Sequence, residues 1–154
     1  MRPASEAERA RLGETFAELC AIESPFGRER ACAQRVAAEL RGMGLEVEED
    51  DAAAAAGAEC GNLLARLPGR SERTILLCAH LDTVETTAPV EPVVVDGGWE
   101  NANDGILGAD NKAAVAVFLE VARRASIEGS EMCIRDSSSA LASEPPPVAI
   151  RLGS

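Results

Sequence analysis

The chain has 154 residues, of which 46% are hydrophobic and only 3% aromatic, and its formal net charge at pH 7 is −11. This length allows one domain with a substantial core, and the composition predicts an aliphatic core. The acidic charge argues against nucleic acid or an anionic membrane as a partner, because either requires a basic surface. No apolar run approaches membrane-spanning length and no secretory leader is visible, so the cytoplasm is the expected location.

Five cysteines are present, an odd number without CxxC spacing. Three of them, Cys20, Cys32 and Cys78, fall at positions that we predict to be buried. We therefore interpret the cysteines as small apolar side chains rather than as disulfide partners.

Two amphipathic helices are predicted first. Ser5 and Glu8 have the form of a capping box, and apolar residues then repeat at helical spacing. The Ser-Pro-Phe-Gly sequence at 24–27 ends this helix, and we interpret it as a plain turn between helices. The second helix is expected from about Arg28, with Met43 still on its apolar face, and Gly42 and Gly44 stop it.

Three strands are predicted next. Alternating residues at 45–48 indicate a half-exposed strand, and the alanine-rich stretch 50–60 is expected to be a loop with room for one helical turn. Residues 62–67 and 74–79 are the second and third strands, and the third reads as a buried, central one. This order of elements predicts an α/β fold, with a mixed β-sheet that has helices on both faces.

A small hairpin and a third long helix complete the predicted elements. The hairpin is expected around Asp96-Gly97-Gly98 within a loop-like stretch, and the helix from Asn111 to about Ala125. After residue 126 the chain changes character. The segment 128–137 resembles a peptide translated from sequencing-adapter DNA, and the remainder has linker composition. We therefore predict a folded part at 1–126 and a disordered or foreign tail at 127–154.

The chain's only histidine, His80, follows the third predicted strand, and Asp82 lies two residues further on. Residues two apart in an extended chain share a face. Asp82 could therefore accept a hydrogen bond from one imidazole nitrogen while the other nitrogen binds a metal ion. A histidine that is merely hydrogen-bonded at the sheet edge fits the same pattern, so both interpretations stay open here.

Asp110 stands at the start of the third long helix, within the sequence Gly-Ala-Asp-Asn-Lys. Its carboxylate could bridge two metal ions, because each oxygen can serve one ion. It could equally cap the helix, and the sequence around Asp110 does not decide between these roles.

With both stretches in view, the sequence resembles the metallopeptidase family M20. The sequence "AHLDTV" (79–84) and the sequence "GADNKAAVA" (108–116) are similar to the first two metal-site signatures of that family, and the second is most similar to its tripeptide aminopeptidase branch. The resemblance covers about Phe16 to Arg124. It implies that 1–126 is the N-terminal part of a catalytic domain with an incomplete zinc-peptidase fold.

The resemblance also implies residue roles. His80 would bind the first metal ion, and Asp82, the candidate catalytic residue, would orient His80. Asp110 would bind both ions. The resemblance further implies that the peptide bond between Asp110 and Asn111 is cis. The implied cofactor is a pair of Zn²⁺ ions, with Co²⁺ or Mn²⁺ possible replacements. The implied substrate is a short peptide, hydrolysed through a metal-bound water, and a homodimer is expected only through a lid domain that this chain lacks.

Several family residues have no counterpart in this chain. No adjacent Glu-Glu pair follows Asp110 to supply the general base, and no second histidine exists. Because a catalytic zinc normally has three protein ligands and the water needs a proton acceptor, we expect weak zinc binding at best and no hydrolysis. Missing strands would also leave an exposed sheet edge.

Several other classes of protein are alternatives to a two-zinc aminopeptidase. A related M20 deacylase or carboxypeptidase, and a non-enzymatic α/β binding domain in which His80 and Asp110 are structural, remain alternatives. A calcium loop at 96–105 fails because Ala102 stands where an oxygen ligand is required. A thiol hydrolase built on Cys78 and His80 is disfavoured because a cysteine buried in a strand is a poor nucleophile.

Overall fold

The computed structural model describes residues 2–69, 74–135 and 148–153. Its elements, in chain order, are α1 Glu6–Ala21, α2 Arg30–Gly42, β1 Val47–Glu49, α3 Ala53–Ala56, β2 Leu63–Leu67, β3 Ile75–His80, β4 Pro92–Val95, β5 Gly98–Asn101, α4 Ala109–Arg135 and β6 Val148–Gly153. Among the described residues, no helix is long and apolar enough to cross a membrane.

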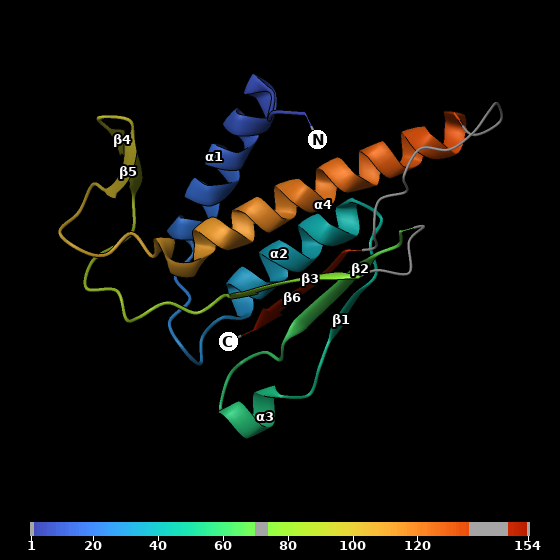
Figure 1. Ribbon diagram of the computed structural model, residues 1–154. Helices are drawn as coiled ribbons and strands as arrows, with labels where there is room; N and C mark the ends of the chain where they lie inside the picture. Colours follow the sequence, from blue (N-terminus) through green and yellow to red (C-terminus); the bar gives the residue numbers. More distant parts are fainter. Residues whose placement is uncertain (1, 70–73, 136–147, 154) are drawn as a thin grey trace.

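Four strands form a mixed sheet in the order β1-β2-β6-β3 (Figure 1). β1 pairs with β2 and β2 with β6 in antiparallel fashion, whereas β6 and β3 run parallel. The connection from β3 through α4 to β6 is thus a β-α-β crossover, which parallel neighbours require. The predicted mixed α/β class is confirmed.

In the described chain the helices cover one face of this sheet. α2 and α4 contact the strands, and α1 packs on α4 away from the sheet (Figure 1). Along β2 and β6 the residues facing the helices are buried, while Arg66 and Arg151 on the opposite face are exposed. The alternation of buried and exposed residues is that of a sheet with one covered face. The prediction also expected helices on the second face, and none lies there among residues 2–69, 74–135 and 148–153.

The first two helices, α1 and α2, lie close to where the sequence indicates, whereas α4 extends beyond its predicted end near Ala125. The Ser5 hydroxyl accepts a hydrogen bond from the Glu8 N–H, and the Glu8 carboxylate accepts one from the Ser5 N–H, which completes the predicted capping box. A guanidinium–carboxylate pair with Arg2 further holds the pKa of Glu8 well below its usual range. The alanine run forms only the single turn α3, which ends at Gly57 in the left-handed region.

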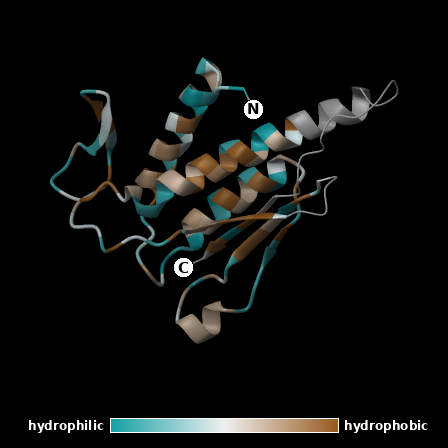
Figure 2. Ribbon diagram, viewed as in Figure 1, coloured by the Kyte–Doolittle hydropathy of each residue, from teal (hydrophilic) through white to brown (hydrophobic). Residues whose placement is uncertain are grey.

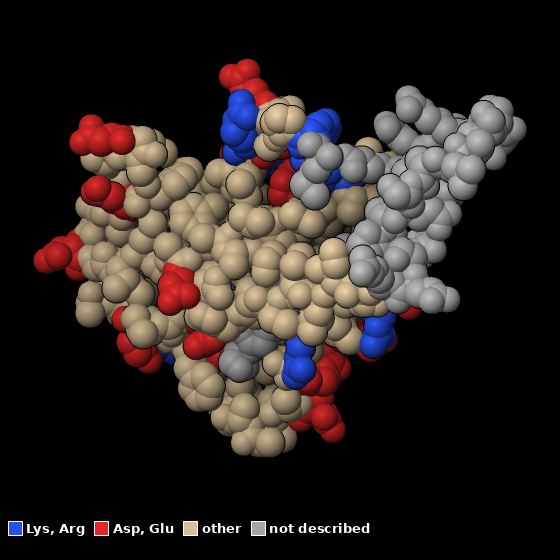
Figure 3. All heavy atoms as spheres, viewed as in Figure 1, with Lys and Arg blue, Asp and Glu red and all other residues tan. Residues whose placement is uncertain are grey.

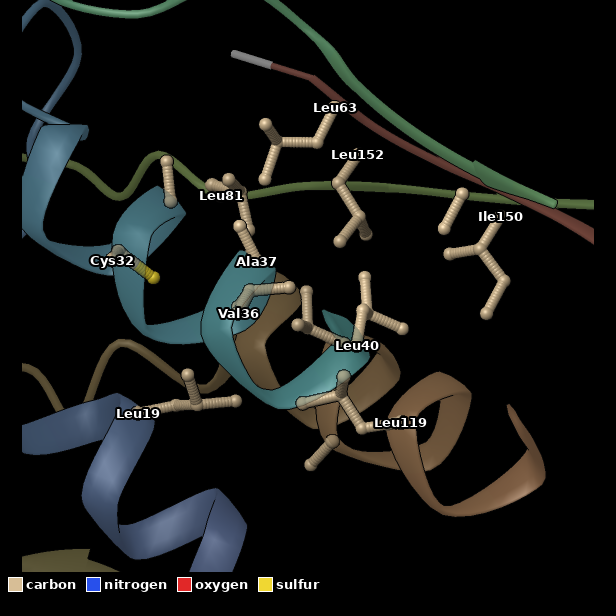
Figure 4. Close-up of a cluster of buried hydrophobic side chains, with 14 of the residues drawn as sticks. Leu19, Cys32, Val36, Ala37, Leu40, Leu63, Leu81, Leu119, Ile150 and Leu152 are labelled. Atoms are coloured by element: carbon tan, nitrogen blue, oxygen red, sulfur yellow. The ribbon is translucent and has the colours of Figure 1, made fainter. Parts of the chain in front are cut away.

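The core lies between the helix layer and the sheet. Figure 4 shows leucine, valine and alanine side chains of α1, α2 and α4 pointing toward side chains of β2 and β6. Almost all of these residues are aliphatic, as the composition predicts. The one aromatic contact between described rings is an edge-to-face pair of Phe16 and Trp99, with centroids 5.8 Å apart, which seats the β4–β5 hairpin on α1.

Ion pairs fix the three long helices to one another. Arg11 of α1 binds Glu120 of α4 at 2.5 Å, and Arg123 of α4 binds Glu39 of α2 at 2.7 Å. Glu39 also pairs with Arg35 one turn earlier on α2. The Glu39 side chain is only 9% exposed, so this part of the network is shielded from solvent and restrains the rotation of α4 against its neighbours.

β3 is an edge strand, not the central buried strand that its composition predicts. It pairs with β6 on one side only, and its other side faces no strand in the described residues. Ile75 and Leu76 are 46% and 57% exposed, and Cys78 is exposed as well. The predicted burial of Cys78 is therefore wrong, whereas Cys20 and Cys32 are buried as expected.

Part of the predicted tail is found in regular structure. The backbone of 127–135 continues α4, and 148–153 form β6 inside the sheet, where Ile150 and Leu152 are buried. Lack of sequence periodicity therefore did not mean lack of structure at these positions. The division of the chain at residue 126, and a foreign origin for the residues beyond it, stay predictions.

Leu119→Ala should destabilise the fold by about 2–5 kcal/mol, the usual cost of emptying a core leucine site. Leu119 is 1% exposed and lies in the central cluster (Figure 4). The measurement is urea unfolding followed by circular dichroism. Val121→Ala, at a position 40% exposed on the same helix, is the matched control and should cost far less; equal losses would contradict this placement of the core.

The open edge of β3 should make the chain self-associate as its concentration rises, because unpaired apolar edge strands recruit further strands. Hydrophobic residues run along β3 (Figure 2), and Ile75 and Leu76 on this strand are exposed. On the face seen in Figure 3, the charged side chains lie mostly toward the rim. Leu76→Lys should reduce the associated fraction in light scattering coupled to size exclusion. Val94→Lys, at an equally exposed position on β4, should leave the associated fraction unchanged; a larger effect there would rule out the β3 edge.

Candidate metal site

Two segments far apart in the sequence meet at the candidate site: the carboxyl end of β3 and the start of α4. Leu81, the first residue after β3, is 1% exposed and points into the core (Figure 4). Because side chains alternate in an extended chain, this anchor turns His80 and Asp82 outward on the same side. Carboxyl ends of strands are where ligands collect in α/β sheets.

His80 lies between the two aspartates singled out in the sequence. Its Nδ1 is 2.9 Å from the carbonyl oxygen of Asp82 and 3.1 Å from the Asp82 Oδ1. Its Nε2 is 3.3 Å from the Asp110 Oδ1. A carbonyl oxygen only accepts hydrogen bonds, so Nδ1 must carry the proton. In the neutral ring the lone pair of Nε2 is then directed toward Asp110.

The backbone around Asp110 departs from helical geometry. The Asp110–Asn111 peptide bond is cis, as the resemblance implied. Asp110 and Asn111 have non-helical φ and ψ, so the regular part of α4 begins at Lys112. Gly108 has φ of +75°, and a β-carbon there would lie 3.3 Å from the Thr83 methyl carbon. Glycine therefore allows the two segments to approach closely at this point.

A third segment, the connection between α1 and α2, contacts the two arms of the site. These arms are the end of β3, which carries His80 and Asp82, and the start of α4, which carries Asp110. Ser24 is fully buried, and its hydroxyl donates to the Leu81 carbonyl at 2.8 Å. The Thr83 N–H donates to the Ser24 carbonyl, also at 2.8 Å, and Pro25 forms a parallel bridge with Thr83. The 24–27 turn, which the sequence indicated as a plain connection, therefore fixes the chain on both sides of Asp82.

Lys112, at the start of α4, makes the corresponding contact between this helix and the connection that follows α1. It is 1% exposed, and its ammonium donates to the Ile22 carbonyl at the end of α1. Burial lowers the pKa of Lys112 from its usual value. Two further buried polar atoms, Thr83 Oγ1 and Glu29 Oε2, have no hydrogen-bond partner in the described chain. The inner side of the site is thus polar as well as buried.

The sequence analysis missed Ser24 and Lys112 as contributors to the site. Nothing about a serine before a proline distinguishes a buried tie from an ordinary turn. Lys112 did carry a signal, because it is the single lysine among 15 lysine and arginine residues and it stands directly before the apolar run 113–119.

The donor atoms fit one part of a zinc site. Imidazole nitrogen and carboxylate oxygen are ligands that zinc accepts at about 2.0–2.2 Å, which places two ligands of a tetrahedral ion roughly 3.3 Å apart. The Nε2–Oδ1 separation of 3.3 Å agrees. Among the described residues, however, no group of three or more His, Cys, Asp or Glu could hold an ion. His80 and Asp110 could therefore contribute two donor atoms to a metal site, and the Asp110 side chain is 93% exposed.

Residues 62–134 match the family model described as Peptidase family M28. An uncharacterized protein YqjE from Bacillus subtilis (strain 168) is 36% identical over 111 residues, which are 71% of this chain and 30% of that protein. The cytosol non-specific dipeptidase of Escherichia coli (strain K12) is 31% identical over 124 residues, covering 71% of this chain and 24% of that protein.

The solved structure of aminopeptidase PepT from Bacillus cereus ATCC 10987 superposes with a TM-score of 0.78 and 27% identity, over 94% of this chain and 36% of that one. The chain thus spans roughly a quarter to a third of each of these three proteins. It is similar in sequence and in fold to peptide-hydrolysing enzymes, and its fold is that of zinc peptidases. The matching family model is that of M28, so the M20 branch stays a proposal.

Ser24→Ala should destabilise the fold by about 1–3 kcal/mol, because the buried Leu81 carbonyl loses its hydroxyl donor. Urea unfolding measures this loss. Ser126→Ala, which removes a hydroxyl that donates to the Arg123 carbonyl within α4, is the matched control and should change stability by less than about 0.5 kcal/mol. If both variants unfold alike, the tie between Ser24 and β3 contributes nothing specific.

Proposed function

We propose that this chain carries the first part of the active site of an M20-type, two-zinc aminopeptidase that hydrolyses short peptides. The observation that supports this most directly is the position of His80, with one ring nitrogen on Asp82 and the other facing Asp110. The similarity to a peptidase family over 62–134 and to an aminopeptidase structure supports the same reaction class.

In this proposal each residue has one task. Asp82 accepts a hydrogen bond from the Nδ1–H of His80, which fixes the tautomer and the direction of the imidazole ring. His80 offers its Nε2 lone pair as a ligand. Asp110 offers two carboxylate oxygens, enough to serve two ions at once. When bound, paired zinc ions supply the Lewis acidity that activates water and polarises a peptide carbonyl.

The proposed substrate class is a short peptide. Two of the proteins that this chain resembles are named as a dipeptidase and an aminopeptidase, and the exposed side chain of Asp110 leaves space for a peptide end. The name of the E. coli relative supports the cytoplasm as the proposed location. Because the described residues provide neither a third ligand nor a nearby general base, we propose that this chain binds zinc weakly and does not itself hydrolyse peptides.

Zinc titration tests the proposal. His80 is the only histidine, so its ring proton resonances in NMR spectra report on this one side chain. Added Zn²⁺ should shift these resonances progressively, and calorimetry should detect no pair of tight sites. The titration belongs in a Cys78→Ser background, because the exposed thiol of Cys78 is itself a zinc ligand.

Two variants decide whether His80 and Asp110 act together. His80→Ala should abolish zinc binding measured by calorimetry, and Asp110→Asn should weaken the zinc-induced shift of the His80 resonances. Asp104→Asn, which removes a carboxylate from the loop before α4, should change neither. A chain in which His80 does not respond to zinc would instead support a binding domain with a structural histidine.

A further inference from the structure

Lys112 is the chain's only lysine, and it is almost completely buried. A buried ammonium is costly unless hydrogen bonds replace its water. In the described residues Lys112 has no carboxylate within ion-pair distance; its ammonium instead donates to the Ile22 carbonyl. A hydrophobic residue would fill the same space at a lower cost in folding free energy. Packing alone therefore does not explain why a lysine occupies this position.

The position of Ile22 explains what the contact achieves. Ile22 is the C-cap of α1, where helix carbonyls lack partners within the helix and the dipole favours a positive charge. Lys112 is the first regular residue of α4, two positions after Asp110. The hydrogen bond therefore joins the end of α1 to the residue that determines where α4, and with it Asp110, begins.

The same short segment holds the other arm of the site. Two residues after Ile22, Ser24 exchanges hydrogen bonds with Leu81 and Thr83, which flank Asp82. Segment 22–24 is thus bonded on one side to the strand end that carries His80 and on the other to the helix start that carries Asp110. Among the described residues no hydrogen bond is found between the strand end and the helix start themselves, which meet only in the 3.3 Å contact of His80 Nε2 with Asp110 Oδ1.

We propose that Lys112 is a positioning residue for the metal site: through segment 22–24 it holds Asp110 at the distance from His80 that zinc requires. This inference rests on the proposed function. It differs from a purely structural role, because a structural lysine would affect stability alone, whereas a positioning lysine sets the zinc affinity of a chain that remains folded.

Lys112→Met tests the inference, since methionine keeps the length of the side chain and removes the donor. In the Cys78→Ser background, the dissociation constant for Zn²⁺ from the His80 ring resonances should rise at least about 10-fold, as expected when a residue that orients a metal ligand is lost. Circular dichroism and urea unfolding verify that the variant is folded at the temperature of the titration.

Leu119→Ala is the control for general destabilisation, because it removes core contacts of α4 without touching segment 22–24. Its zinc affinity should equal that of the parent chain. Should Lys112→Met prevent folding, Ser24→Ala replaces it, since it cuts the same connection on the β3 side and should also weaken zinc binding.

The outcomes separate the two claims. If the parent chain binds zinc at His80 and Lys112→Met binds it equally well, or if Leu119→Ala weakens binding to the same extent, the positioning role is wrong and the proposed function stands. If zinc does not shift the His80 resonances of the parent chain, the proposed function fails, and the role of Lys112 fails with it.

Discussion

The hydrogen bonds made by segment 22–24 are the constraint on which the site depends. The strand end at His80 and the helix start at Asp110 are separated by thirty positions of mostly loop and hairpin, and loops are poor at fixing side chains. Segment 22–24 bonds to both of them. Ser24 donates a hydrogen bond to Leu81 at the strand end, and the Ile22 carbonyl accepts one from Lys112 at the helix start. The half-buried side chains of His80 and Asp82 and the exposed carboxylate of Asp110 therefore lie over buried polar contacts. Such support is the general requirement for a preorganised site.

The packing of α4 also contributes to the position of Asp110. The ion pairs of Glu39 and Glu120 fix α4 against α1 and α2, and the β-α-β crossover fixes α4 against β3 and β6. α4 is thus bonded to its neighbours both at its start, through Lys112, and near its middle, through Glu120 and Arg123. The site is supported on its inner side and open on its outer side, where the Asp110 side chain is largely exposed.

Local signals in the sequence were sufficient for most elements. The capping box at Ser5, the Asp-Gly turn of the hairpin and the helical spacing of α2 each depend on neighbours within a few positions, so they could be predicted. The environment of β3 could not, because its composition is that of a strand covered on both sides, whereas the described chain covers only one. β6 was missed for the opposite reason: a six-residue strand inserted between β2 and β3 has no local marker that separates it from linker.

The candidate site shows the same division. His80, Asp82 and Asp110 could be singled out because their spacing and their neighbours matched known signatures. Ser24 and Lys112 act over 57 and 90 positions of sequence separation, and no local pattern encodes such contacts.

The burial of the only lysine has a practical consequence. A protease specific for lysine could cut this chain at a single peptide bond, and that bond lies at the foot of α4 beneath the site. Cleavage would require the helix to detach from segment 22–24. The rate of that one cut would therefore report how often the base of the site opens in the native protein.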